Sequence, residues 1–154
     1  AKSLFPDKHN RYYGLSSTNL AMLFYRNGMY EKALEEFYEA YELLSSSESI
    51  QDNALFAYNV GVIYLAMGNY DMAYPCFSHI AYDESETVRP YRLRALHQLA
   101  TTAYQQRKYS AANYYINQCF RFFTSEELFA GVYATKGDVL LAHEELDSAL
   151  CCYR

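Results

Sequence analysis

The sequence predicts an all-α protein built as a solenoid of antiparallel helix hairpins. One pattern occurs four times in the 154 residues: a small residue is followed seven positions later by a turn position and twelve positions later by an alanine. Self-similarity at a period of about 20 to 50 residues is typical of solenoids, whose units contact their neighbours and build an extended binding surface. The four sets are Ala21/Gly28/Ala33, Gly61/Gly68/Ala73, Ala100/Arg107/Ala112 and Gly137/Glu144/Ala149, and their alanines at 33, 73, 112 and 149 lie 40, 39 and 37 residues apart.

The second observation is a helical period on both sides of each turn position. In the second copy, Gly61 and Leu65 belong to a stripe with a spacing of three and four, and Ala73 and Phe77 belong to another. Such spacing indicates helices, and Gly68 between them tolerates the left-handed geometry of a tight turn. We expect the small residues to lie where two helix axes cross. The large residues four positions after each alanine, which should fill the adjacent groove, are Phe37, Phe77, Ile116 and Tyr153.

We therefore expect each repeat to contain a first and a second helix. Pro90 should open the fifth helix near its first turn, and Thr124 with Glu127 is interpreted as a capping box at the start of the seventh. Pro75, inside the fourth helix, should remove one backbone hydrogen bond and bend that helix. The predicted helices cover residues 8–27, 30–46, 51–67, 70–83, 89–107, 109–123, 125–143 and 146–154.

At these positions the chain resembles the tetratricopeptide repeat (TPR) family. The family pattern of small, aromatic, glycine, aromatic, alanine, aromatic and alanine is matched by Ala21-Phe24-Gly28-Tyr30-Ala33-Phe37-Ala40 and by Gly61-Tyr64-Gly68-Tyr70-Ala73-Phe77-Ala81. The third copy departs from it at Arg107 and Cys119, and the fourth at Glu144 and Leu146. The resemblance implies a right-handed superhelical solenoid, and the long period is similar to that of bacterial peptide receptors and regulators.

The repeats are expected to form a single array over residues 1–154. Neither end shows the polar face that normally caps a terminal repeat, so we expect the chain to be a piece of a longer protein. The predicted parts are the tail of a preceding repeat at 1–6, three repeats at 8–47, 51–85 and 88–123, and a truncated fourth repeat at 125–154.

Composition and motifs argue against several functions. A net charge of −5 and a pI near 5.3 disfavour sequence-independent nucleic-acid binding, which needs a basic stripe. No apolar run approaches the roughly 18 residues of a membrane span. No catalytic or phosphate-binding motif and no CxxC pair is found, so we expect no enzyme activity, no metal and no cofactor. The free cysteines favour a cytoplasmic location, with a periplasmic or exported one as the alternative if a signal was removed.

The candidate site is the concave groove that the family builds from its first helices. One column of this groove would hold Asn19, Asn59, Gln98 and then Thr135. Amide side chains present a donor and an acceptor together and can grip the backbone of an extended peptide; alternatively, these amides bond between neighbouring helices. The predicted peptide-binding residues are Asn19, Tyr25, Tyr58, Asn59, Arg94, His97, Gln98 and Tyr104.

A local basic cluster stands out in this acidic chain. Arg89, Arg92, Arg94 and His97 gather at the start of the predicted fifth helix. They form either a solvated helix end or a docking point for a carboxylate or phosphate, which guanidinium groups bind as a fork. In the second case, Arg94 and His97 would meet an acidic side chain or a C-terminal carboxylate of the ligand.

Two classes of function follow. The favoured one is a non-enzymatic repeat module that binds a peptide or protein segment, as the sensing or docking segment of a larger regulatory, signalling or assembly protein. The alternative is a purely structural scaffold without a specific groove ligand, which self-associates through the ends of the array. An enzyme is the third and least favoured class.

Overall fold

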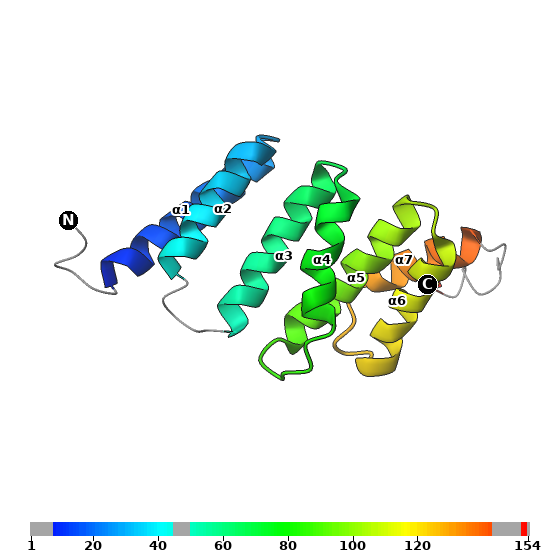
Figure 1. The fold of residues 1–154 in the computed structure, drawn as a ribbon. Helices are drawn as coiled ribbons and strands as arrows, with labels where there is room; N and C mark the ends of the chain where they lie inside the picture. Colours follow the sequence, from blue (N-terminus) through cyan, green and yellow to red (C-terminus); the bar gives the residue numbers. More distant parts are fainter. Residues whose placement is uncertain (1–7, 45–49, 143–151, 154) are drawn as a thin grey trace. The chain divides into compact units, whose positions relative to one another are not determined.

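The computed structural model describes residues 8–44, 50–142 and 152–153. These residues contain α-helices and no strand, which confirms the expected all-α chain of helical hairpins (Figure 1). The tail at 1–6, the turn residue Glu144 and most of the predicted helix at 146–154 lie outside the described residues. The helices are α1 (Lys8–Arg26), α2 (Tyr30–Leu44), α3 (Ile50–Ala66), α4 (Tyr70–Ala81), α5 (Arg89–Gln105), α6 (Tyr109–Phe122) and α7 (Ala130–Ala142).

The chain folds as two compact units, Ala1–Ala73 and Tyr74–Arg154, whose boundary falls inside α4. In the first unit, α1 packs against α2, and α2 packs against α3. In the second unit, α5 packs against α6, and α7 contacts both of them. Within each unit, therefore, a helix contacts the next helix in the sequence, and α5 also contacts α7, the second helix after it.

Three hairpin turns share one backbone geometry. Gly28 and Gly68 have φ of 73° and 71°, and Arg107, at the equivalent place in the third turn, has φ of 59°. The third turn therefore departs from the TPR pattern in sequence but keeps the left-handed backbone conformation. The amide after each turn position donates to the carbonyl five residues earlier, as in a Schellman motif: Met29 to Phe24 at 2.9 Å, Asn69 to Tyr64 at 2.8 Å and Lys108 to Ala103 at 2.9 Å.

The residues of the repeated pattern form the core of the units. Ala21, Ala33, Ala73, Ala100 and Ala112 are each 0% exposed. The large residues four positions after the alanines are also buried at Phe37, Phe77 and Ile116. Their close packing leaves little room for longer side chains at the alanines.

The small residue of the fourth repeat packs differently. A Cβ built on Gly137 would lie 2.5 Å from the ring of Tyr153. Tyr153 is nevertheless 48% exposed, because its ring covers Gly137 from the surface while its hydroxyl donates to Oδ1 of Asp138 at 2.5 Å.

The start of the seventh helix was predicted wrongly. It begins at Ala130 and not at residue 125. Thr124 and Glu127 do pair as expected, since Oε2 of Glu127 accepts from the Thr124 amide at 2.7 Å and from its hydroxyl at 3.1 Å. The pairing closes one isolated turn at residues 125–127, and α7 starts only after Phe129, whose ring packs against His97.

Pro75 is exposed on α4, which runs through it without interruption from Tyr70 to Ala81. Its carbonyl accepts a hydrogen bond from Oγ of Ser78 at 3.2 Å. Nothing in the structure gives this proline a functional role.

Candidate binding site

In the first unit, the predicted site residues lie on α1 and α3. Asn19 is exposed, whereas Tyr25, Tyr58 and Asn59 are half-buried. The ring of Tyr25 packs on Tyr30 across the hairpin turn, with 5.9 Å between centroids. This tyrosine therefore stabilises the turn with one part of its ring and leaves another part accessible.

In the second unit, the predicted residues all lie on α5. Arg94 is exposed, and His97, Gln98 and Tyr104 are half-buried. Tyr104 packs on Tyr109 at 5.6 Å between centroids, as Tyr25 packs on Tyr30 in the first unit. The same packing of an aromatic pair across a turn thus occurs in two repeats.

His97 joins α5 to the start of α7. Its Nε2 lies 3.0 Å from the carbonyl oxygen of Gly131 and 2.9 Å from Oγ1 of Thr135, and the Phe129 ring packs edge-on at 5.0 Å. Burial lowers the pKa of His97, partly opposed by the Gly131 carbonyl, so the ring is neutral at pH 7. At Thr135, the last member of the predicted polar column, the polar group bonds between neighbouring helices.

Two of the three arginines in the basic cluster are engaged within the fold. Arg89 donates from Nε to Oε1 of Glu127 at 2.9 Å and from Nη2 to the carbonyl of Phe122 at 3.0 Å. Arg92 donates from Nη1 to the carbonyl of Asp83 at 3.4 Å. Both guanidinium groups also lie over the Phe123 ring, at 4.8 Å and 5.6 Å. The sequence does not predict this neutralisation of Arg89, because Glu127 is 38 positions away.

Arg94 is the member of the cluster that remains available. No hydrogen bond or ion pair of Arg94 is found within residues 8–44, 50–142 and 152–153. Beside it lies a pocket of about 390 Å³, which we call the Arg94 pocket. Since Arg89 and Glu127 neutralise each other on its wall, the charge of Arg94 is uncompensated there. The lining residues are Arg89, Pro90, Leu93, Arg94, Phe123, Glu127 and Phe129.

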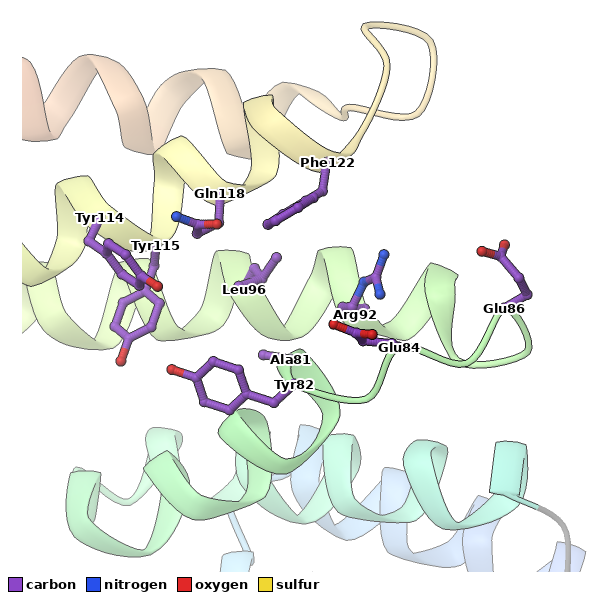
Figure 2. Close-up of a pocket in the computed structure, with 10 residues that line it drawn as sticks. All are labelled: Ala81, Tyr82, Glu84, Glu86, Arg92, Leu96, Tyr114, Tyr115, Gln118 and Phe122. Atoms are coloured by element: carbon purple, nitrogen blue, oxygen red, sulfur yellow. The ribbon is translucent and has the colours of Figure 1, made fainter.

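A second pocket, of about 450 Å³, is lined by the end of α4, the loop after it, α5 and α6 (Figure 2). We call it the tyrosine pocket. None of its residues belongs to the groove that the sequence predicts, because that groove lies on first helices. The sequence signal for this pocket is a set of aromatic residues outside the repeated pattern, of which Tyr82, Tyr114 and Phe122 are 62%, 53% and 49% exposed. The lining residues are Ala81, Tyr82, Glu84, Glu86, Arg92, Leu96, Tyr114, Tyr115, Gln118 and Phe122.

The cysteines and the acidic residues form no metal site in the described part of the chain. Cys76, Cys119 and Cys152 are free thiols there, and burial raises the pKa of Cys119 to about 12. No group of three or more metal-ligating side chains occurs among the described residues. None of the described helices is long and apolar enough to cross a membrane.

Comparison with known proteins supports the fold. No protein-family profile and no curated protein sequence matches the chain. Among solved structures, BtubC (BKLC) from P. vanneervenii is similar with a TM-score of 0.66 and 16% sequence identity, over 97% of this chain and 63% of BtubC. PilF of Pseudomonas aeruginosa is similar with a TM-score of 0.60 and 19% identity, over 95% of this chain and 76% of PilF.

Both neighbours are TPR-like helical proteins, so the chain has the fold of a TPR-like helical-repeat solenoid. At these identities the likeness concerns the fold alone. The chain spans less than two thirds of BtubC. The right-handed sense of the superhelix and the division into repeats stay predictions.

Proposed function

We propose that the chain is a non-enzymatic repeat module that binds a peptide or protein segment, as the sensing or docking part of a larger regulatory or assembly protein. The TPR-like fold supports this proposal in general terms. The single observation that carries it is the exposed guanidinium of Arg94 beside a pocket with four apolar side chains in its wall.

The chemistry of the Arg94 pocket defines the ligand. Its one uncompensated charge is positive, which favours an anionic group, and a guanidinium binds a carboxylate through two parallel hydrogen bonds. Pro90 and Phe129 are the exposed apolar residues of its wall and offer surface to a neighbouring side chain of the ligand. We therefore propose a segment with a carboxylate next to an apolar residue, at an acidic side chain or at a C-terminus.

The remaining predicted residues keep their proposed roles within each unit. Tyr58 on α3 and Tyr104 on α5 would contact ligand side chains, as would Tyr25 on α1. His97 contributes no charge in this proposal, because it is neutral and hydrogen-bonded to α7. Its role is to hold the ring of Phe129, which lines the Arg94 pocket. The residues proposed to bind the ligand backbone are Asn19, Asn59 and Gln98.

Calorimetry with a short peptide ending in Asp-Leu tests the proposal. The free C-terminal acid should bind the wild type more tightly than the amidated peptide does, with an affinity that falls as salt is added. Arg94→Gln should weaken binding of the free acid about tenfold or more, because a charge-assisted hydrogen bond contributes about 1.5 to 3 kcal/mol. Gln98→Ala, on the same helix as Arg94, should have a smaller effect.

Arg121→Gln is the matched control, since Arg121 is exposed on α6 and lines neither pocket. It should leave the affinity unchanged. Equal losses in the two arginine variants would show a general charge effect and remove the Arg94 pocket from the proposal. If no acidic peptide binds the wild type, the structural-scaffold function becomes the better one.

A further inference from the structure

The tyrosine pocket is separate from the site proposed above. It shares no lining residue with the Arg94 pocket and contains none of the predicted groove residues. Four of its residues come from α6 and three from the loop after α4. The kind of ligand that the tyrosine pocket binds therefore has to be inferred from its own lining residues.

Tyrosines form one end of the pocket (Figure 2). The Tyr115 hydroxyl lies 3.1 Å from that of Tyr74, and its ring meets Tyr114 edge-on, with 5.4 Å between centroids. Burial and the neighbouring hydroxyls of Tyr74 and Tyr82 raise the pKa of Tyr115, so it stays neutral. Tyr115 is thus held in place, while Tyr82 and Tyr114 expose much of their rings to a ligand.

Carboxylates dominate the charge at the other end. Glu84 and Glu86 are exposed in the loop between α4 and α5. Arg92 also lines the pocket; its Nη1 donates to the Asp83 carbonyl and its guanidinium lies over Phe123, while its Nε is buried without a hydrogen-bond partner in the described residues. Glu127 first and Glu86 last raise the pKa of Arg89, so the Glu86 carboxylate lies within electrostatic reach of that guanidinium. No hydrogen bond or ion pair of Glu84 is found in the described residues. Two carboxylates and one guanidinium line the tyrosine pocket, so its net charge is negative, opposite in sign to the charge of Arg94 in the Arg94 pocket.

We propose that the tyrosine pocket is a second binding site, which takes an arginine side chain of a basic partner segment. The planar guanidinium would stack on the exposed tyrosine rings at one end of the pocket, and the carboxylates of Glu84 and Glu86 at the other end would attract its positive charge. The methylene stem would lie over Leu96 and Phe122. A volume of about 450 Å³ falls in the ordinary range of ligand pockets. An anionic ligand is disfavoured because it would meet both carboxylates.

A titration followed by NMR tests this proposal with N-ethylguanidinium as the probe and N-ethylurea as its uncharged analogue. The cation should shift the resonances of Tyr82, Tyr114 and Gln118 in a saturable manner, and the urea should not. The double variant Glu84→Gln, Glu86→Gln should weaken binding about fivefold or more. Tyr114→Ala should weaken it about two- to fivefold, as expected for one exposed cation–π contact.

Two control variants separate this site from the first. Glu126→Gln removes an exposed carboxylate that lines neither pocket, and Arg94→Gln removes the charge of the Arg94 pocket; both should bind the cation like the wild type. Circular dichroism checks that each variant keeps its helices. Equal responses to the two probes, an unchanged affinity in the double glutamine variant, or the absence of saturable shifts at these residues would each overturn the proposal.

Discussion

Arg107 adopts a backbone conformation that glycine provides at the two equivalent turns. A Cβ built on Gly28 or Gly68 meets no atom within 4 Å, so space does not demand glycine there. Glycine is favoured there because φ is positive, and a positive φ brings the Cβ of an L-residue close to its own backbone at a cost of about 1 to 2 kcal/mol. Arg107 bears this cost at a φ of 59°, while the flanking Schellman hydrogen bonds keep the turn in place.

The substitution Arg107→Gly should therefore stabilise the protein. Relief of the strain is partly offset by the greater freedom of glycine in the unfolded chain, which leaves a gain of about 0.5 to 1 kcal/mol. Urea unfolding measures the difference. Gln106→Gly is the control, because Gln106 has an ordinary φ of −79° and should lose stability on substitution. A gain of the same size at both positions would mean that strain at Arg107 is not the cause.

At the scale of elements, the connection between α6 and α7 shows where sequence patterns stop being sufficient. Periodicity and turn chemistry are local, so the helix starts at Tyr30, Tyr70 and Tyr109 could be predicted from the chain itself. The pairing of Thr124 with Glu127 was also local and correct. The helix start expected after it was wrong, since α7 begins at Ala130 after Phe129. The contact of Phe129 with His97 joins residues far apart in sequence, and no local signal predicts it.

The ion pair of Arg89 and Glu127 should make stability depend on acid. The Arg89 hydrogen bonds and the Thr124 amide lower the pKa of Glu127 from 4.5 to about 2 in the folded protein. Because the folded pKa is the lower one, the stabilisation is present above pH 4.5 and is lost as pH falls toward 2. Glu127→Gln should accordingly lower the free energy of unfolding at pH 6 and flatten its decline below pH 5.

Urea unfolding at a series of pH values measures this dependence. Glu126→Gln is the neighbouring control and should retain the acid dependence of the wild type, since Glu126 makes no ion pair in the described residues. Parallel curves for wild type and Glu127→Gln would show that the carboxylate does not contribute as the geometry implies.

At the scale of the whole molecule, the repeated pattern predicted the fold class but not the pockets. The alanines of the pattern report on helix packing, which recurs in the hairpins of α1 with α2 and of α5 with α6 and is therefore visible in one sequence. The pockets depend on residues outside it, such as Tyr82 in a loop and Phe122 at a helix end. The sequence also does not predict that His97 is neutral, because burial lowers its pKa and no single-sequence pattern shows that burial.

Packing between neighbouring helices implies that damage in one hairpin should stay near it. In the first unit α1 packs on α2, and in the second α5 packs on α6. Ala33 and Ala112 occupy the same position in these hairpins, and both are 0% exposed. Leucine at either position should overpack the hairpin and cost about 1 to 3 kcal/mol. In a solenoid, whose repeats are coupled mainly to their nearest neighbours, this loss should be local.

Native-state hydrogen exchange of the two variants tests this expectation by a crossed comparison. Ala33→Leu should accelerate amide exchange in α1 and α2 and leave α6 and α7 near their wild-type rates. Ala112→Leu should do the reverse, so each variant serves as the control for the other. Uniform acceleration of all helices in both variants would show instead that the chain opens as one cooperative body, because a loss at either position would then lower the same global free energy of unfolding.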